Sequence, residues 1–321
     1  MVERGSPLSA LVTGGGGFIG HHLVRKLLTV GYEVRVLDNF ATGRRERLKG
    51  FDVELVEGDL RSYERAHAAV RGTELVFHLG AVPSVPRSVQ DPLTTSAVNI
   101  EGTLNVLLAA RDEGVRRVVF ASSSSVYGAS PALPKREDHL PLPVSPYGVS
   151  KLAAEQYCRA FANVYSLETV SLRLFNVFGP GQDPLSQYAA VVPRFISAIN
   201  EDRPPVIYGD GSQTRDFTFI ADVVDAFAAA GESDAAVGEV LNVAAGCETS
   251  VSELVRLLAE LFQAEITPRF EPARPGEVKR SGADRSKAAS LIGWEPTWSL
   301  TEGLLECMND STPVPGGARR R

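Results

Sequence analysis

Short apolar runs alternate with longer amphipathic stretches along the first half of the chain. The apolar runs predict strands at 8–13, 33–37, 53–57, 75–79, 117–122 and 169–175. The longer stretches predict helices at 18–30, 63–70, 99–113 and 147–165. Unbroken apolar strands that alternate with helices are typical of a parallel sheet covered on both faces. The pattern therefore predicts an α/β fold with a doubly wound parallel sheet.

This rhythm ends near residue 178. The segments GPGQDP, RPP and GDGSQT are turn-rich, and the helices predicted around them are shorter, at 190–200, 222–230 and 250–261. We therefore expect a first domain over 1–177 and a smaller C-terminal α/β lobe over 178–310, beside the carboxyl ends of the strands. The last stretch, 311–321, has no apolar periodicity and is expected to form a flexible tail.

A glycine-rich turn, TGGGGFIG at 13–20, joins the first predicted strand to the first predicted helix. Glycines permit a tight turn and the close approach of a pyrophosphate, while the helix N-terminus offers free N–H groups and a positive dipole. Such a turn can also serve only to pack a strand against a helix. Here Asp38 closes the second strand 18 residues after Gly20, which favours a dinucleotide site. No GKS or GKT follows, which argues against a P-loop kinase or ATPase.

Asp38 also bears on which dinucleotide binds. Its carboxylate suits the ribose hydroxyls of NAD and would repel the 2′-phosphate of NADP, although Arg44 and Arg45 are near enough in sequence to reach in. We therefore expect NAD. Asp59 either contacts adenine or caps a turn, and both interpretations stay open. The positions assigned to the cofactor are Gly14, Gly17, Phe18, Ile19, Gly20, Asp38, Asn39, Asp59, Leu60, Leu79, Ala81 and Lys151.

Tyr147 and Lys151 are four residues apart on a predicted helix that follows Pro146, so they face the same side. A free tyrosine, with a pKa of about 10, is a poor base at neutral pH. A lysine ammonium one turn away, the helix N-terminus and a nicotinamide cation would all stabilise the phenolate. Tyr147 can then take a proton from a substrate hydroxyl while hydride leaves for NAD.

Neither this pair nor the four consecutive serines at 122–125 is specific alone. A tyrosine and a lysine at this spacing often lie on the surface, and a serine run is more often a turn. The serines, however, end the strand beside the predicted cofactor, where a hydroxyl can bind the same substrate oxygen. Together with the glycine-rich turn, the pattern predicts a catalytic set of Ser123, Tyr147 and Lys151.

The composition of the chain limits the kinds of molecule that it is expected to bind. Lys+Arg 33 against Asp+Glu 39 gives a net charge of −6, so no basic field exists to hold nucleic acid or anionic lipid, and an anionic ligand needs a local cluster of cations. Cys158, Cys247 and Cys307 are scattered without a CxxC pair, which argues against a disulfide framework or a zinc site. No run of 18 apolar residues predicts a membrane span, and the start MVERGSP does not resemble a signal peptide. We expect a cytoplasmic protein without a bound metal.

In combination the motifs resemble the extended short-chain dehydrogenase/reductase family, in particular its NAD-dependent nucleotide-sugar epimerases and dehydratases. The resemblance rests on TGGGGFIG, on Ser123 with YGVSK at 147–151, and on RLFNVFGP at 173–180, and runs from about residue 8 to residue 304. It implies a Rossmann-type first domain and a C-terminal lobe that binds a UDP-sugar. It also implies that NAD stays bound, oxidises the sugar at C4 and usually returns the hydride.

The resemblance also assigns roles to residues. Ser123 corresponds to the catalytic hydroxyl, Tyr147 to the base and Lys151 to its partner. Asn176 corresponds to a contact of the sugar diphosphate, and Arg215 and Arg274 to contacts of the diphosphate or nucleotide. Guanidinium groups held locally are also what a pyrophosphate needs on an acidic protein, although both arginines could form ordinary surface ion pairs. The positions assigned to the substrate are Ser84, Arg87, Ser123, Asn176, Arg215, Arg274 and Ser281.

The sugar and the reaction follow from finer likenesses. The segment 84–93 resembles epimerases that accept UDP-N-acetylglucosamine, and Ser281 falls where a small residue leaves room for an N-acetyl group. The family's 4,6-dehydratases carry Thr-Asp-Glu where this chain has serines at 123–125, which disfavours 4,6-dehydration. We therefore expect C4 epimerisation. The chain is also similar to the UDP-N-acetylglucosamine 5,6-dehydratase type of tunicamycin biosynthesis, an antibiotic pathway, and no residue decides between the two outcomes.

Two further alternatives stay open. Some proteins of this fold bind a dinucleotide only as sensors, but Ser123, Tyr147 and Lys151 are all present here, which favours an enzyme. The resemblance also implies a homodimer in which the helices at 99–113 and 147–165 pair with their copies. Periodicity alone does not distinguish that arrangement from burial beneath the chain's own second lobe.

Overall fold

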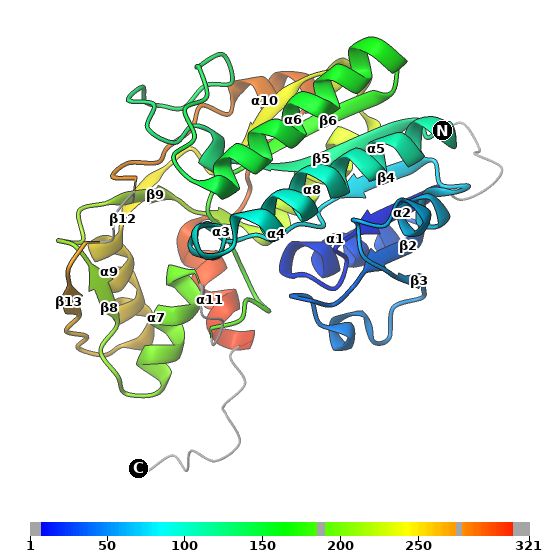
Figure 1. Ribbon diagram of the computed structural model, residues 1–321. Helices are drawn as coiled ribbons and strands as arrows, with labels where there is room; N and C mark the ends of the chain where they lie inside the picture. Colours follow the sequence, from blue (N-terminus) through cyan, green and yellow to red (C-terminus); the bar gives the residue numbers. More distant parts are fainter. Residues whose placement is uncertain (1–7, 185–189, 274–277, 311–321) are drawn as a thin grey trace.

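The computed structural model describes residues 8–184, 190–273 and 278–310 of the chain (Figure 1). At its centre lies a seven-stranded parallel sheet with the order β11-β6-β5-β4-β1-β2-β3. The strands are β1 (Ser9–Thr13), β2 (Glu33–Asp38), β3 (Val53–Glu57), β4 (Leu75–His78), β5 (Arg117–Ser123), β6 (Glu168–Leu174) and β11 (Val240–Val243). The strand order reverses between β1 and β4, and ligands of such sheets bind outside the carboxyl ends of the strands at this point.

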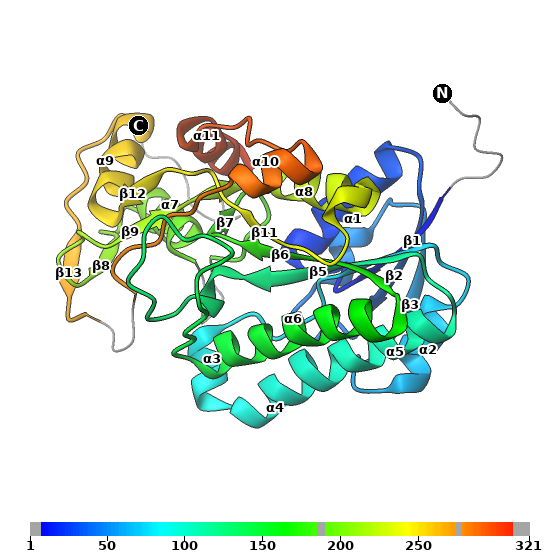
Figure 2. The same ribbon diagram turned by 90° about the horizontal axis from the view of Figure 1, so that it is seen from above.

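Helices cover both faces of the sheet (Figure 2). One face carries α2 (Tyr63–Val70), α5 (Gly102–Asp112) and α6 (Pro146–Tyr165), and the other carries α1 (Phe18–Thr29) and α8 (Ile220–Glu232). Each layer of helices buries its own apolar cluster against the strands. This two-sided burial explains why the strands read as unbroken apolar runs and not as alternating ones. The expected doubly wound α/β fold is confirmed.

The helix predicted over 99–113 is the end of a longer helical region. The short helix α4 (Pro92–Ser96) continues through a π turn (Ala97–Glu101) into α5. The Asp91 side chain accepts a hydrogen bond of 3.0 Å from the backbone N–H of Thr94, and Pro92 occupies the first turn. Both features favour a helix start, and they place it before the region where apolar periodicity becomes visible.

Beyond β7 (Val177–Phe178) the chain builds a smaller lobe at the carboxyl ends of the strands, on the left of Figure 1. Its elements are α7 (Val191–Asn200), β8 (Val206–Tyr208), β9 (Thr214–Asp216), β12 (Glu248–Ser250), α9 (Val251–Phe262), β13 (Arg269–Glu271) and α11 (Leu300–Asp310). Strand β9 pairs with β12, β8 pairs with β13, and β10 (Thr218–Phe219) pairs with β7.

The second half of the chain also returns to the central sheet. Strand β11 extends the sheet beside β6, helix α8 covers one face of it, and α10 (Ser286–Ile292) packs near both. Residues after 178 therefore contribute both to the smaller lobe and to the central sheet. The three shorter helices expected in this half lie where α7, α8 and α9 are found.

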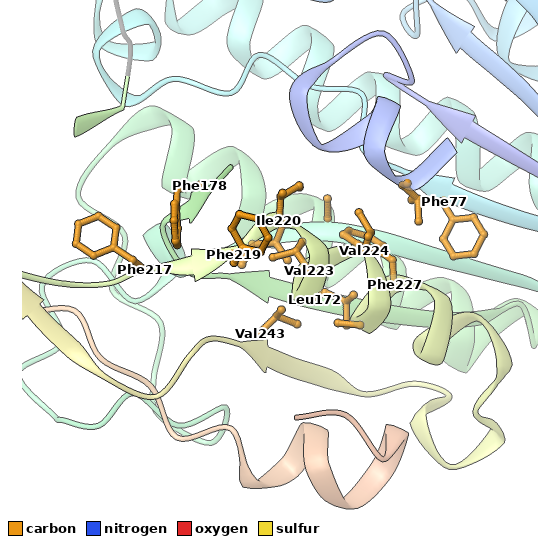
Figure 3. Packing of buried hydrophobic residues seen from close by; sticks show 14 of the residues in the cluster. Phe77, Leu172, Phe178, Phe217, Phe219, Ile220, Val223, Val224, Phe227 and Val243 are labelled. Atoms are coloured by element: carbon orange, nitrogen blue, oxygen red, sulfur yellow. The ribbon is translucent and has the colours of Figure 1, made fainter. Parts of the chain in front are cut away.

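One apolar core joins the sheet to the lobe (Figure 3). Phe77 of β4 packs edge-on against Phe227 of α8 beneath the sheet, with ring centroids 6.5 Å apart. Further along the same core, Phe178 packs against both Phe217 and Phe219, with centroids 6.3 and 5.5 Å away. Because protein interiors are close-packed, this shared core holds the lobe in a defined place relative to the ends of the strands.

Arg117, at the start of β5, is a fully buried cation. Its guanidinium donates to the carbonyl oxygens of Ala230, Gly231 and Ser233 at the end of α8, at 2.9–3.2 Å. It also pairs with Glu168 and Asp234, each at 2.8 Å. The orphan carbonyls at a helix C-terminus need donors, and here one side chain supplies them while it joins α8 to the sheet.

We predict that Arg117→Met lowers the free energy of unfolding by about 3 kcal/mol or more, because it leaves several buried carbonyls without donors. Urea unfolding followed by circular dichroism measures the change. Arg256→Met, which removes an exposed arginine paired with Glu260 on α9, is the matched control and should change stability little. Equal losses for the two variants would contradict this role of Arg117.

Candidate functional site

The glycine-rich turn lies at the reversal point of the sheet. Gly14 has a φ of +71°, and a Cβ on it would lie 2.8 Å from the Cα of Gly80, which follows β4. A Cβ on Gly20, in the first turn of α1, would overlap the carbonyl oxygen of Gly14. The turn is therefore closed by backbone packing against backbone, which only glycine permits at these two positions.

The start of α1 is open to an anion. Gly17 is its N-cap, no side chain bonds the first-turn N–H groups, and Phe18, Ile19 and Gly20 include no acidic residue. Free N–H groups and the positive end of the dipole therefore face the turn. Asp38 ends β2 beside it, with its carboxylate accepting hydrogen bonds of 2.8 Å from the N–H groups of Gly16 and Phe40. A glycine cradle, an uncapped helix N-terminus and a carboxylate after the second strand fit a dinucleotide such as NAD.

The other cofactor positions surround this turn. Leu79 and Ala81 follow β4, and Leu60 packs against Gly80 from the other side. Asn39 donates to Asp59 at 3.0 Å, and Asp59 also accepts from the backbone and the guanidinium of Arg61. These bonds hold the pKa of Asp59 down, at about 2. The turn-capping interaction expected as one interpretation of Asp59 is therefore present in the structure.

Both arginines weighed for a 2′-phosphate have partners in the structure. Arg44 forms an ion pair with Asp183, and Arg45 forms one with Glu57. The guanidinium of Arg45 also lies 4.7 Å from the ring centre of Phe40. Each guanidinium is already paired with a carboxylate. This agrees with the choice of NAD over NADP, since a 2′-phosphate would need a cation of its own near Asp38.

Ser123, Tyr147 and Lys151 come together at the meeting point of β5 and α6. Ser123 is the last residue of β5, and Tyr147 and Lys151 lie in the first two turns of α6. A Cβ on Gly148 would lie 2.7 Å from the carbonyl oxygen of Ser125, so glycine allows the helix to approach the serine turn. The Ser123 hydroxyl lies close enough to the phenol of Tyr147 to lower its pKa. The three predicted catalytic residues thus form one cluster.

Burial shifts both titrating groups of this cluster toward neutrality. It raises the pKa of Tyr147, a shift that the nearby Ser123 hydroxyl opposes. It lowers the pKa of Lys151 to about 8. The Lys151 ammonium donates to the carbonyl oxygen of Ala121 at 2.8 Å and lies 4.9 Å from the ring centre of Phe120. Lys151 therefore stays mostly protonated at neutral pH, one helical turn after Tyr147.

The start of α6 is held by hydroxyl groups. Ser145 caps the helix by accepting from the N–H of Gly148, and Ser88 accepts from the N–H of Tyr147 at 3.0 Å. Ser88 lies in α3 (Val85–Gln90), whose own N-cap is Ser84, accepting from the N–H of Arg87 at 3.2 Å. Ser84 and Arg87, both expected to bind substrate, therefore lie at the start of α3, beside the catalytic helix. A serine followed within two residues by proline was the unused sequence signal for α3.

A pocket of about 220 Å³ opens in the smaller lobe, and both Asn176 and Arg215 line it. Its wall is largely apolar, with polar groups at a few places, as is typical of ligand pockets. The remaining lining residues that bear on recognition are Arg194, Tyr208, Gln213 and Phe217. None of these four was predicted, although Gln213 and Phe217 flank Arg215 in the same motif.

The other substrate positions are placed as follows. Arg215, in β9, donates to the carbonyl oxygens of Thr214 and Val278 at 2.8 Å. Asn176 follows β6 in a left-handed conformation with a φ of +22°. Ser281 is half-buried and does not line the pocket. The carbonyl oxygen of its neighbour Gly282 accepts a hydrogen bond from the N–H of Lys135. Arg274 lies outside the described residues.

The model of the NAD dependent epimerase/dehydratase family matches residues 10–244, which include the glycine-rich turn and the catalytic cluster. This chain belongs to that family. The expectation of an NAD-dependent enzyme of the extended short-chain dehydrogenase/reductase type is confirmed, with NAD as its cofactor. The residues of the glycine turn and Asp38 are those that would hold it.

Known members of the family resemble the chain over nearly its whole length. A UDP-glucose 4-epimerase of Mycolicibacterium smegmatis is 42% identical, covering 93% of this chain and 97% of that protein. The structure of a Thermotoga maritima UDP-glucose 4-epimerase with UDP-glucose matches at a TM-score of 0.91 and 37% identity, covering 94% and 98%. A UDP-N-acetylglucosamine 4-epimerase of Methanobrevibacter ruminantium, in complex with UDP-N-acetylmuramic acid, matches at 0.90 and 37%, covering 95% and 98%.

Two observations apply to the described ranges, 8–184, 190–273 and 278–310. No helix in them is long and apolar enough to cross a membrane. No three side chains of His, Cys, Asp and Glu gather there in a way that would hold a metal ion.

We predict that Gly20→Ala abolishes tight NAD binding, because the added Cβ overlaps the carbonyl oxygen of Gly14 and opens the turn. The NAD released on denaturing the purified protein measures the effect. Gly72→Ala is the matched control, since its φ of +74° makes alanine strained but no atom lies within 4 Å of the added Cβ. It should lower the melting temperature and keep its NAD. A Gly20→Ala protein that retains NAD would refute the assignment of the cradle.

Proposed function

We propose that this enzyme epimerises UDP-N-acetylglucosamine, or a closely related UDP-hexosamine, at C4. The observation that carries the proposal is the cluster of Ser123, Tyr147 and Lys151 at the same sheet edge as the glycine cradle, with a pocket in the adjoining lobe. The relatives named above as 4-epimerases of UDP-sugars support the reaction. Ser124 and Ser125, where 4,6-dehydratases carry an acid and a base, disfavour dehydration across C5 and C6 by that route.

NAD, when bound, supplies the acceptor for the hydride from C4 and the donor that returns it. The chain's own part is to move the proton of the C4 hydroxyl. Tyr147 takes this proton as a general base and gives it back when the other face of the ketone is reduced. Ser123 donates a hydrogen bond to the same substrate oxygen and steadies the charge that develops on it.

Tyr147 needs help to act as a base, because burial raises its pKa. Three features of the chain oppose this rise. Lys151 would bring an ammonium from one turn further along the helix, the Ser123 hydroxyl lowers the pKa of the phenol, and Tyr147 lies in the first turn of α6, at the positive end of the helix dipole. The same burial removes competing water, which strengthens each of these electrostatic contributions.

The choice of a UDP-hexosamine as substrate rests on two features, one for the sugar and one for the nucleotide. Ser281 is small, which leaves space for an N-acetyl group if it lies beside the sugar ring. The pocket lined by Asn176 and Arg215 suits the nucleotide end, since an amide and a guanidinium can bind the diphosphate and an apolar wall can hold the base. With Arg215 holding the diphosphate, the sugar would extend toward Tyr147.

We predict that incubation with UDP-N-acetylglucosamine gives a product of unchanged mass and a new anomeric proton signal. Mass spectrometry and proton NMR of the same reaction measure both. Loss of one water would indicate 5,6-dehydration and overturn the proposed epimerisation. UDP-glucose, run in parallel, tests the sugar, and turnover of UDP-glucose alone would overturn the N-acetyl preference.

Tyr147→Phe should lower turnover by about 10²–10⁴-fold, because it removes the group that transfers the proton. Tyr157→Phe, on the exposed face of the same helix, is the matched control and should keep full activity. Retained NAD in Tyr147→Phe shows that the variant is folded. Undiminished turnover in this variant would contradict the mechanism.

We also propose that the protein is a homodimer. Helix α6 presents an apolar stripe to solvent, consisting of Val149, Ala153, Tyr157, Ala160 and Val164. Val164 is 70% exposed, and the chain's own second lobe lies at the other end of the sheet and does not cover the stripe (Figure 2). An exposed apolar face of this length favours pairing with a second copy.

We predict that Ala160→Glu combined with Val164→Glu shifts the protein from a dimer to a monomer in multi-angle light scattering, because the carboxylates cannot be buried in the pairing face. Val30→Glu, at an exposed apolar position just after α1 on the opposite face, is the control and should leave the mass unchanged. A monomeric wild-type protein would refute the proposed dimer.

A further inference from the structure

Four buried polar side chains that the proposed reaction does not use form a series in space. It runs from the glycine turn to helix α6. Thr13 ends β1 and His78 ends β4. Asn99 lies in the π turn, and Thr103 lies in the first turn of α5. All four are almost completely buried. Buried polar groups are normally hydrogen-bonded, so the position of each proton can be worked out from the partners.

The proton of Thr13 is assigned first. Its hydroxyl oxygen accepts hydrogen bonds from the backbone N–H groups of Leu79 and Gly80, at 3.1 and 3.0 Å. A hydroxyl has two acceptor sites and one proton, so both acceptor sites are occupied. The remaining close partner is Nδ1 of His78, at 2.7 Å. The Thr13 hydroxyl therefore donates its proton to Nδ1.

This assignment decides the state of the histidine. Because Nδ1 is an acceptor, the single proton of the neutral ring lies on Nε2, which donates to the hydroxyl of Thr103 at 2.9 Å. Thr103 in turn donates to the carbonyl oxygen of Asn99 at 2.6 Å. A proton on Nδ1 would face the proton of Thr13 and break the first bond. Every donor in the series therefore points the same way.

The surroundings of His78 also keep the ring neutral. Its ring packs against Phe120, with centroids 5.7 Å apart, and the Lys151 ammonium of α6 approaches Phe120 as well. Burial, and secondarily the charge of Lys151, lower the pKa of His78 to about 3. A charged imidazolium is thus excluded at neutral pH.

Asn99 extends the series to the catalytic helix. Its side-chain oxygen accepts from the N–H of Val82 at 2.7 Å, and its side-chain nitrogen donates to the Ser150 hydroxyl at 3.0 Å. Ser150 donates to the carbonyl oxygen of Tyr147 at 2.8 Å. The segment 79–82 is therefore held at one end by Thr13 and at the other by Asn99. The same series ends on the backbone of Tyr147.

We propose that His78 is a positioning residue for the cofactor: its neutral ring, with the proton on Nε2, completes a one-way series of hydrogen bonds that fixes residues 79–82 between the glycine turn and the catalytic helix. Without an acceptor at Nδ1, the Thr13 hydroxyl loses its fixed orientation. The N–H of Gly80 then loses a defined partner, whereas the N–H of Leu79 keeps its bond of 3.2 Å to the backbone carbonyl oxygen of Thr13. Gly80 lies directly against Gly14, so this change reaches the cradle. The inference concerns the binding of NAD and does not depend on which sugar is the substrate.

The test compares His78→Phe with His78→Gln. Phenylalanine keeps a planar ring but can neither accept from Thr13 nor donate to Thr103, whereas the glutamine amide can do both. His78→Phe should bind NAD on the order of 10-fold more weakly, the equivalent of one buried hydrogen bond, and His78→Gln should restore most of the affinity. Titration of the cofactor-stripped variants with NAD, followed by calorimetry, measures the dissociation constants.

Thr169→Val is the control for a merely structural loss. It removes a buried hydroxyl in β6 that donates to the carbonyl oxygen of Cys158 at 3.0 Å, away from the cofactor turn. It should lower the melting temperature without weakening NAD binding. Equal weakening by Thr169→Val and His78→Phe, or unchanged affinity in His78→Phe, would overturn the proposal.

The wild-type protein offers a test that needs no variant. In nitrogen-15 NMR of the histidine rings at pH 7, His78 should show a protonated Nε2 and an unprotonated Nδ1, and its signals can be assigned by the contacts of its ring protons with those of Phe120. A proton on Nδ1, or a doubly protonated ring, would overturn the proposal even if the variants failed to fold.

Discussion

Close approach of backbone to backbone at the carboxyl edge of the sheet is the constraint on which this site depends. Gly14 meets Gly80, Gly20 meets Gly14, and Gly148 meets the carbonyl of Ser125, in each case nearer than a Cβ would allow. The first two contacts shape the cofactor cradle, and the third brings Tyr147 to Ser123. Since the seven strands of the central sheet are parallel, their carboxyl ends share one edge, and the three contacts fall within one region.

Electrostatics of the site then follow from burial more than from net charge. The chain carries a charge of −6, yet the first two turns of α6 hold a half-buried tyrosine, whose pKa rises, and a buried lysine, whose pKa falls to about 8. An isolated tyrosine in such a place would stay neutral. In the proposed mechanism the ammonium, the helix dipole and the Ser123 hydroxyl make it a usable base. A core shared with the smaller lobe keeps the pocket in a defined place relative to it.

Much of the fold was predictable because the signals were local. Each predicted strand of the central sheet agrees with the structure to within about one residue, since apolar runs bounded by turns define parallel strands well. The short helix α3, the π turn and the edge strand β11 were not predicted. Their apolar content is too brief to show periodicity, and the return of β11 to the sheet depends on pairing with β6, more than 60 residues earlier.

The sequence by itself determined the glycine turn, Asp38 and the set of Ser123, Tyr147 and Lys151, because each rests on residue types at a fixed local spacing. Only the tertiary structure decided which other residues support them. Ser88 reaches the N–H of Tyr147 across 59 positions, and His78 joins Thr13 to Thr103 across β1, β4 and α5. Such contacts come from folding distant segments together. A single serine or histidine in the sequence does not indicate its hydrogen-bond partner, because the two come within bonding distance only when the chain folds.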